Sequence, residues 1–472
     1  MLLVNAPFPG RLKFQANPSS MLNAITPFVQ SCEQNNVEPG VGYLDPGEPS
    51  HEFWGSLREL LLRGHVRAVC LSSSTAAIEE AAKIVSLVQD LAPSVLLIAG
   101  GPHEDDCREK MANRIPGIDL SIGGEAEFVL DFVLRSFLNA EMESASFCAW
   151  LGEVLALAPI SAGRFTVSSS WWGRPASRDF DFGAVGPEQL IETVQVTRPM
   201  TFSVFEAKQT LPLMVSRGCS YGKCTFCAEA SLSGRPTVWP HFEWVRELIE
   251  QHPGAALYFQ DSIFPQTKQV REELLPLLKE MQVEWGCQVY LRGLSKSFLE
   301  QLASHGCSYL YTGIETSSSG LLDAVGKVGM GAEFALERLG WIRDQGIRAG
   351  VSLMFGVFSV DGVLLENHDT VNRTVDLTDS ITRSGVDVAG FYPNVLTVLP
   401  GTGLERGLHA SGIELDFYSI PRAEAFSELE DGSVGYNFLT VPEIVAEGCK
   451  DSLAEHIAAA ALQVQRQAAS VW

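Results

Sequence analysis

The chain has 472 residues, of which 46% are hydrophobic and 19% charged. This composition suits a compact globular protein with a large core, and the length excludes a single small binding module. At about 100 to 200 residues per domain, the length predicts two to four domains. The 57 acidic residues outnumber the 34 basic ones and give a formal net charge of −23, which argues against general binding to nucleic acid or anionic membranes and favours a small-molecule substrate.

The amino-terminal sequence MLLVNAPFPG lacks the basic start and the long apolar region of a signal peptide. No stretch of the sequence reaches the roughly 18 to 20 apolar residues that span a bilayer. We therefore expect a cytoplasmic protein that does not associate with a membrane.

The first part of the chain, residues 1–145, alternates short β-branched runs with helical spacing, as in a doubly wound, Rossmann-like α/β domain. The spacing of apolar residues predicts a helix over residues 76–91. The predicted strands are Leu2–Asn5, Val66–Leu71, Val95–Ala99 and Leu120–Ile122.

Each of these predicted strands ends in polar residues or glycines. In an open parallel sheet a ligand lies at the carboxyl edge of the strands, whereas any one glycine alone is explained by a tight turn. Four such strand ends in one sheet favour a site for a nucleotide-like or corrin-like cofactor. The candidate residues at this edge are Asn5, Ser72, Ser73, Gly100, Gly101, His103, Gly124 and Glu125.

Residues 146–205 are aromatic and turn-rich, which is typical of an interdomain linker. From 206 to 405 the α/β rhythm resumes with polar residues at strand ends, which predicts a partial, TIM-type (β/α)6 barrel. We expect residues 406–472 to form a mostly helical region. The predicted barrel elements are strands over Leu211–Val215, Leu257–Gln260, Tyr309–Thr312, Gly350–Met354 and Val386–Tyr392, and helices over Glu243–Gln251, Val270–Met281, Ser297–His305 and Ala332–Gln345.

Three of the ten cysteines, Cys219, Cys224 and Cys227, fall within nine residues. Three thiolates on one loop can occupy three corners of a cubane iron-sulfur cluster and leave the fourth iron open to a substrate or cofactor. A zinc site would usually want a fourth protein ligand, and the nearest histidine, His241, is distant in the sequence. A zinc site and three unrelated core cysteines are the alternative interpretations.

The sequence SRGCSYGKCTFC, from Ser216 to Cys227, resembles the cluster loop of the cobalamin-binding class of the radical S-adenosylmethionine (SAM) superfamily, which includes the class B methyltransferases. It departs in one point, because four residues separate Cys219 and Cys224 where the family commonly has three. The resemblance covers residues 1 to 405 through motifs in the family's order. These are Val4-Asn5-Ala6-Pro7, Gly100-Gly101-Pro102-His103, Gly124-Glu125-Ala126-Glu127, Asp261, Gly313-Ile314-Glu315-Thr316 with Lys327, Gly356 and Pro400-Gly401-Thr402.

The resemblance implies that the three cysteines hold a 4Fe-4S cluster and that SAM chelates the open iron through its amino and carboxylate groups. Gln260, Asp261 and Ser262 would lie near the methionyl amine of SAM. Glu315 would lie near that amine or the ribose hydroxyls, where a carboxylate accepts charge-assisted hydrogen bonds. For Asp261 and Glu315, a strand-end carboxylate that caps the next helix is the alternative.

Two further residues receive roles from the resemblance. Phe226 would shield the cluster and pack near the adenine, and its alternative is an ordinary core residue. Arg292, after the predicted strand Gln288–Leu291, would pair with a carboxylate of SAM or substrate. A surface salt bridge is the alternative for this arginine.

The resemblance implies bound cobalamin as a further cofactor. The Asp-x-His-x-x-Gly pattern, which supplies a lower histidine ligand in other cobalamin proteins, does not occur in this sequence. The lower face of the corrin would then be left to water or a nonligating side chain. His103 lies on the expected loop, where a histidine more often forms only a hydrogen bond.

The implied activity is methylation of an unactivated carbon in a small, natural-product or lipid-like molecule. One SAM would methylate cob(I)alamin, and a second would yield a 5′-deoxyadenosyl radical that abstracts a substrate hydrogen before methylcobalamin donates its methyl group. An external electron donor such as flavodoxin or ferredoxin would be needed. The alternatives are a cobalamin-binding radical cyclase, rearrangement or elimination enzyme and, from another class, a noncatalytic metal- or corrin-binding regulator.

Overall fold

The structure is a computed structural model that describes most of residues 1–140, most of residues 204–418 and several short segments. The described residues are 1–6, 42–44, 50–73, 77–101, 111–123, 126–140, 164–167, 178–181, 204–207, 209–229, 236–418, 453, 456–457, 459–461 and 463–464.

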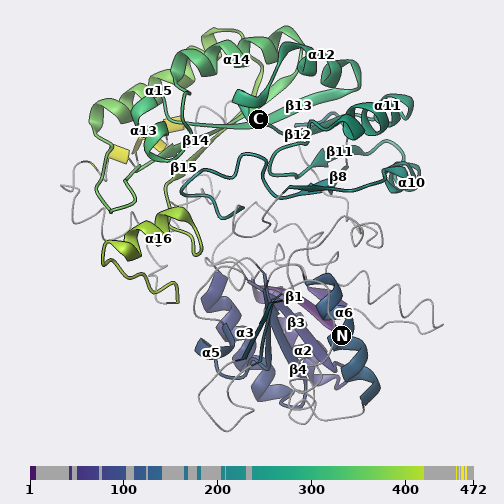
Figure 1. The fold of residues 1–472 in the computed structure, drawn as a ribbon. Coiled ribbons are helices and arrows are strands. Elements are labelled where there is room, and N and C mark those ends of the chain that lie inside the picture. The colour runs from purple at the N-terminus through teal and green to yellow at the C-terminus, as the bar shows by residue number, and fades with distance from the viewer. Residues whose placement is uncertain are drawn as a thin grey trace.

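Within these residues, seven strands form a first sheet in the order β2-β1-β3-β4-β5-β6-β7 (Figure 1). The first five strands in this order run parallel, which confirms the predicted α/β unit with a parallel sheet. Each predicted strand lies within two residues of an observed one. The elements are β1 Leu2–Asn5, β2 Gly42–Leu44, α2 Ser50–Leu62, β3 Ala68–Ser72, α3 Ile78–Leu91, β4 Leu96–Gly100, α5 Met111–Arg114, β5 Leu120–Gly123 and α6 Glu127–Ala140.

The first sheet also contains two strands that the sequence analysis did not predict. β6 (Arg164–Val167) pairs antiparallel with β5, and β7 (Arg178–Asp181) pairs antiparallel with β6. Both strands fall within residues 146–205, which we interpreted as a linker. Because an edge strand exposes unpaired backbone groups, a following short segment can pair with it at little cost. These two strands of the expected linker therefore extend the first sheet, whereas Val204 and Phe205 at its end pack against the second sheet.

Six strands form a second sheet in the order β15-β14-β13-β12-β11-β8 within the described residues, and all neighbouring strands are parallel. Because the strands follow one another in chain order, each crossover returns to the adjacent position, as in a (β/α) barrel wall. The strands are β8 Thr210–Leu213, β11 Ala256–Phe259, β12 Trp285–Gln288, β13 Cys307–Glu315, β14 Arg348–Phe355 and β15 Val388–Val395.

The helices of this second unit cover one face of its sheet. Figure 1 shows α12, α14 and α15 along the outer side of the strands. The elements between and after the strands are β9 Ser216–Arg217, β10 Thr237–Val238, α10 Glu243–Gln251, a π-helix Val270–Leu274, α11 Leu275–Glu280, a 3-10 helix Leu291–Gly293, α12 Lys296–Ser304, α13 Ser319–Ala324, α14 Ala332–Asp344, α15 His368–Arg383 and α16 Gly403–Ala410.

Two predicted elements differ in detail from the structure. The single helix expected over Val270–Met281 begins as a π-helix, in which the Leu275 amide donates to the Val270 carbonyl. Pro276 follows directly and lacks an amide hydrogen, so the regular hydrogen-bond ladder is interrupted there. The strand expected over Gln288–Leu291 is also wrong in its bounds, because β12 ends at Gln288 and a 3-10 turn begins at Leu291.

Each sheet has its own hydrophobic core. The larger one lies between the second sheet and its helices and includes Leu257, Trp285 and Leu339, all fully buried. The first sheet is packed against α2 and α3 by residues such as Leu57 and Ile84. No helix of the described segments is long and apolar enough to cross a membrane.

Two of the carboxyl groups that the fold buries in part or in full, Asp119 and Glu366, have raised pKa values. Burial raises the pKa of Asp119 to about 7, although the Leu97 amide donates to its carboxylate at 2.8 Å. Burial also raises the pKa of Glu366 to about 7, against hydrogen bonds from the amides of Gly356 and Val357. In an unfolded chain the pKa of both groups is about 4, so the folded protein holds their protons more tightly. The contribution of the two groups to the free energy of unfolding is therefore complete below pH 4 and is lost as the pH rises through 7.

We predict that Glu366→Gln flattens this pH dependence. The raised pKa of Glu366 corresponds to roughly 3 kcal/mol of unfolding free energy that the parent protein loses between about pH 4 and about pH 8. Thermal unfolding midpoints across that range measure the slope, which should be shallower in the variant. Glu300→Gln, an exposed residue on α12, is the matched control and should keep the parental slope. Equal slopes for the parent and Glu366→Gln would contradict the prediction.

Candidate functional site

The three clustered cysteines lie on the loop that follows β8 at the carboxyl edge of the second sheet. The loop begins with Gly218, whose φ of 87° reverses the chain after β9. The Gly222 amide donates to Cys219 Sγ at 3.4 Å, and the Cys227 amide donates to the Cys224 carbonyl at 3.3 Å. All three thiols are free and partly exposed, so they are available as ligands.

Two segments distant in the sequence hold the backbone of this loop. The Thr225 amide donates to the Val325 carbonyl at 3.1 Å, and the Leu404 amide donates to the Thr225 carbonyl at 2.7 Å. Gly326, with a φ of 82°, lies so close that a Cβ atom there would overlap the Lys223 carbonyl oxygen. The middle of the loop is therefore fixed between the end of α13 and the start of α16.

A pair of tyrosines flanks the same loop. The Tyr221 hydroxyl donates to the Gly326 carbonyl, and its ring lies 4.6 Å from the ring of Tyr290 between centroids. Burial raises the pKa of the Tyr290 hydroxyl, and the adjacent Tyr221 hydroxyl raises it further. The sequence analysis missed this pair; an aromatic residue directly after the β12 strand end was the available signal.

Two of the three thiols, those of Cys224 and Cys227, have raised pKa values in the absence of a ligand. Burial raises the pKa of Cys224 to about 12, and the nearby Lys327 ammonium partly opposes that shift. Burial raises the pKa of Cys227 as well. Metal binding would therefore release protons from this loop. Within the described segments, no three His, Cys, Asp or Glu side chains are arranged around the position of a single metal ion.

Glu315 and Lys327 form a buried ion pair near the loop. Glu315 ends β13 with a φ of 69°, and Lys327 Nζ lies 2.6 Å from its Oε1 atom and 3.1 Å from the Gly313 carbonyl oxygen. Burial alone would lower the pKa of Lys327, but the attraction and hydrogen bond of Glu315 raise it. A Cβ atom at Gly313 would overlap Glu315 Oε1 and lie 3.0 Å from Lys327 Nζ, so a side chain there would displace the ion pair.

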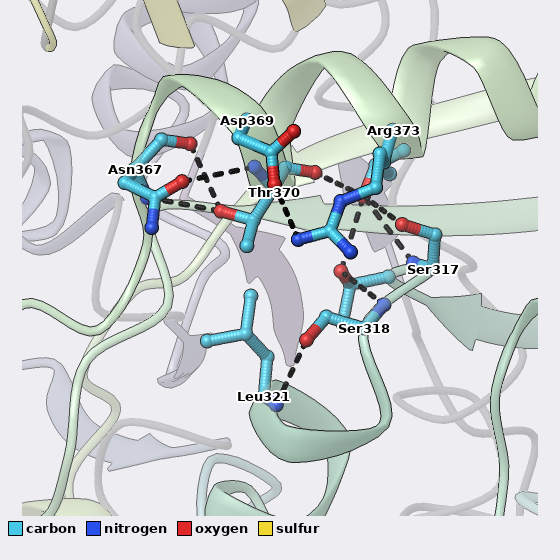
Figure 2. Close-up of polar contacts among 9 residues, drawn as sticks. Ser317, Ser318, Leu321, Asn367, Asp369, Thr370 and Arg373 are labelled. Atoms are coloured by element: carbon cyan, nitrogen blue, oxygen red, sulfur yellow. Dashed lines mark hydrogen bonds and ion pairs between the residues drawn. The ribbon is translucent and has the colours of Figure 1, made fainter.

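The turn after Glu315 is anchored to α15, as Figure 2 shows. The Ser317 amide donates to Thr374 Oγ1 at 3.2 Å, and Thr316 Oγ1 lies 3.0 Å from the same atom. Ser318 caps α13 by accepting a hydrogen bond from the Leu321 amide. Asn367 and Thr370 close the first turn of α15 as a reciprocal capping box. These bonds keep Glu315 in its left-handed backbone conformation.

Asp261 contacts the base of the cysteine loop. Its two carboxylate oxygens lie 3.2 and 3.3 Å from the Val215 amide nitrogen, and the Ser216 hydroxyl donates to Oδ1 at 2.5 Å. Burial raises the pKa of Asp261 to about 7 in spite of these donors. The carboxylate therefore ties β11 to the residues just before Cys219, and its expected contact with the methionyl amine stays a prediction.

The other predicted residues of this edge have different surroundings. The Gln260 amide donates to the Leu213 carbonyl at 2.8 Å, and Ser262 is half-buried beside it in sequence. Phe226 packs against an apolar cluster that includes Leu321 and Leu404. Arg292 is exposed and donates to the Val328 carbonyl rather than to a carboxylate. Its proposed pairing with SAM or substrate stays a prediction.

Aromatic side chains gather on the face of the second sheet opposite its helix-covered core. The Tyr258 and Tyr309 rings lie 6.1 Å apart, and the Phe205 ring lies 6.0 Å from Tyr309. Tyr311 and Tyr392 form a second pair at 5.4 Å. This layer packs apart from the main core.

The structure brings together part of the predicted edge of the first sheet. The Ser73 amide donates to the Gly100 carbonyl at 3.1 Å, and the Ala6 amide donates to the Ser72 carbonyl at 2.9 Å. A Cβ atom at Gly101 would lie 3.0 Å from the Ser73 amide nitrogen. The backbone of Asn5 pairs with Ser72 in register. His103, Gly124 and Glu125 lie outside the described residues.

We predict that Lys327→Met destabilises the protein by roughly 3 to 5 kcal/mol, because it leaves the buried Glu315 carboxylate without its cation. The double variant Glu315→Gln with Lys327→Met should recover much of this loss, since no charge is then left uncompensated. Denaturant unfolding midpoints measure both effects. A single Lys327→Met variant as stable as the parent would show that the Glu315–Lys327 pair does not contribute to the stability of the protein.

The sequence and the structure were each compared with those of known proteins. The sequence matches no protein-family model. It is 21% identical over 342 residues to the uncharacterized methyltransferase PH0819 of Pyrococcus horikoshii, a match that covers 71% of this chain and 68% of the relative.

Solved structures resemble this chain over most of its length. A structure of the radical SAM methyltransferase TsrM from Kitasatospora setae, with tryptophan substrate and aza-SAM bound, matches with a TM-score of 0.61 at 15% identity and covers 96% of this chain and 89% of TsrM. The cobalamin-dependent SAM radical enzyme OxsB, with aqua-cobalamin bound, matches with a TM-score of 0.61 at 13% identity, over 88% of this chain and 63% of OxsB. The chain therefore has the fold of the cobalamin-dependent radical SAM enzymes.

Proposed function

We propose that this protein is a cobalamin-dependent radical SAM enzyme that methylates an unactivated carbon of a small molecule. One observation carries this assignment. Three free cysteines share a loop at the carboxyl edge of a six-stranded parallel sheet, with the buried Glu315–Lys327 pair beside Cys224. The TsrM structure that contains cobalamin and a [4Fe-4S] cluster and the relative named as a methyltransferase support it.

In this proposal the chain has the domains that its sequence predicts. Residues 1–145 form the Rossmann-like cobalamin-binding domain, residues 206–405 the radical SAM barrel and residues 406–472 a carboxyl-terminal region. The two strands within residues 146–205 add to the first sheet.

The cysteine loop suits an iron-sulfur cluster by the chemistry of its ligands. Cys219, Cys224 and Cys227 would each bind one iron through a thiolate, which leaves one iron for SAM. Such a cluster, when bound, supplies the electron that cleaves a carbon-sulfur bond of SAM. An external low-potential donor, such as flavodoxin or ferredoxin, would in turn reduce the cluster.

The chain's own residues would bind and orient SAM. Glu315 would accept hydrogen bonds from the amine or ribose hydroxyls of SAM while it stays paired with Lys327. Asp261 would hold the base of the cysteine loop through Val215 and Ser216. The aromatic layer around Tyr309 would help to exclude water from the barrel interior.

The edge of the first sheet would bind the corrin. Ser72, Ser73 and Gly100 lie together there, and small side chains let a large planar ring approach the backbone closely. Cobalamin, when bound, would carry the methyl group.

Labelled SAM tests the assignment. Protein reconstituted anaerobically with iron and sulfide should form 5′-deoxyadenosine when SAM, a strong reductant and cobalamin are added. Methyl-labelled SAM is then supplied together with a small molecule, and labelled product should form. The first molecule to test is L-tryptophan, the substrate bound in TsrM, and other small molecules follow. Deoxyadenosine with an altered but unlabelled product would favour a radical cyclase, rearrangement or elimination enzyme. Failure to form an iron-sulfur absorption band near ~400 nm, with zinc bound instead, would favour a metal-binding regulator.

We predict that Cys224→Ala lowers 5′-deoxyadenosine formation by about two orders of magnitude or more, because the cluster loses one of its three ligands. Iron per chain and product formation measure the effect. Cys307→Ala, which changes a buried cysteine of β13, is the control and should retain both. An equally active Cys224→Ala variant would overturn the catalytic assignment.

We also predict that Gly326→Ala impairs cluster assembly, because the added methyl group would displace the Lys223 carbonyl in the cysteine loop. Iron content after reconstitution should fall severalfold. Gly254→Ala has a similar φ of 80° but open space around its Cβ position, so it isolates backbone strain from the steric effect. Equal iron content in the two variants would contradict the prediction.

A further inference from the structure

A short segment after α16 contacts both α/β units. We call residues 412–418 the strap. Figure 1 shows α16 and the chain beyond it on the side of the second sheet that faces the first. Arg114, the last residue of α5 in the first unit, lies 302 positions from Asp416 in the sequence and contacts it directly. The strap therefore joins two units that the sequence keeps far apart.

The contact has three parts. Arg114 Nη2 donates to Asp416 Oδ2 at 2.9 Å and to Oδ1 at 3.2 Å. The Arg114 guanidinium also lies 5.0 Å from the centre of the Tyr418 ring, and the Tyr418 amide donates to Asp416 Oδ1 at 3.0 Å. Because the ion pair is partly exposed, its charges alone contribute little to the free energy of unfolding. The carboxylate and the ring nevertheless hold the guanidinium from two sides in one arrangement.

Apolar packing extends this contact toward the cysteine loop. Phe417 is 6% exposed and belongs to the apolar cluster that also contains Leu321, Val325 and Leu404. Phe226, in the cysteine loop, packs against the same cluster. Tyr418 packs against both this cluster and the core of the first unit. A shift of the strap would therefore change the packing around Phe226 in the cysteine loop.

The other end of the contact is hydrogen-bonded to a strand that ends at the candidate cofactor edge of the first sheet. α5 follows β4, which ends at Gly100. The Ala112 amide donates to Ser121 Oγ in β5 at 3.2 Å, and Ser121 is fully buried. Arg114 thus belongs to a helix that is fixed to a strand ending at that edge.

We propose that the strap is an interdomain clamp, and that Arg114, Asp416 and Tyr418 are positioning residues that hold the candidate cobalamin edge in register with the cysteine loop. This inference rests on the proposed function. Without the clamp, each unit would keep its own fold and ligands, but the reacting groups of the two cofactors would be held together less often.

Hydrogen exchange tests the clamp without any cofactor. In Arg114→Ala, the amides of Ala112, Ile115 and Tyr418 should exchange about fivefold faster than in the parent, because the two segments no longer fix each other. Arg63→Ala removes an exposed arginine–carboxylate ion pair with Glu59 at the end of α2 and should leave the exchange of these amides unchanged. Unchanged exchange in Arg114→Ala would overturn the clamp, whether or not the protein proves to be an enzyme.

Product ratios test its effect on the proposed reaction. With SAM, titanium citrate and cobalamin, 5′-deoxyadenosine reports the second unit alone, whereas S-adenosylhomocysteine reports methyl transfer between the two units. Arg114→Ala should lower the ratio of S-adenosylhomocysteine to 5′-deoxyadenosine about fivefold, and the charge-exchanged double variant Arg114→Asp with Asp416→Arg should restore it in part. An unchanged ratio in Arg114→Ala would refute the positioning role. If the parent forms neither product, the proposed function fails and the positioning role fails with it, while the exchange result stands by itself.

Discussion

The candidate site depends on the contact of the cysteine loop with two backbone segments that arrive from later in the chain. The Val325 carbonyl and the Leu404 amide bond to Thr225 from opposite sides, and Gly326 leaves no room for a side chain against Lys223. The three thiols owe their positions to this backbone contact, because the loop itself contains few internal hydrogen bonds. A metal centre can then be held by only three protein ligands without the loop collapsing around it.

The same contact places charges beside the thiols. Gly326 and Lys327 are adjacent in the short connection after α13. Gly326 packs against the cysteine loop, and Lys327 pairs with Glu315. The turn that follows Glu315 is held by Thr374 of α15, which ties the acidic group to a different helix from the one that positions its lysine. The site is therefore built from β8, β13, α13, α15 and α16 together, and none of these elements could form it alone.

Much of this architecture could be predicted from the sequence, because the apolar runs of parallel strands and the glycines and polar residues at their ends are local signals. The helix α10 was predicted with its observed bounds. The helix α15 was not, since its many threonines have low helix propensity; in the structure Thr374 and Thr382 satisfy their hydroxyls on carbonyls one turn back. The ring contact of Tyr221 with Tyr290 and the contact of Arg114 with the strap join residues 69 or more positions apart, and no local pattern encodes such pairs.

The most direct measurement of the central claim is the electron paramagnetic resonance spectrum of the reduced, reconstituted protein before and after SAM is added. A centre held by Cys219, Cys224 and Cys227 alone has an iron to which SAM can bind, so its spectrum should change on addition of the ligand. A spectrum that stays the same at saturating SAM would mean that every iron already has a protein ligand, and would contradict the account.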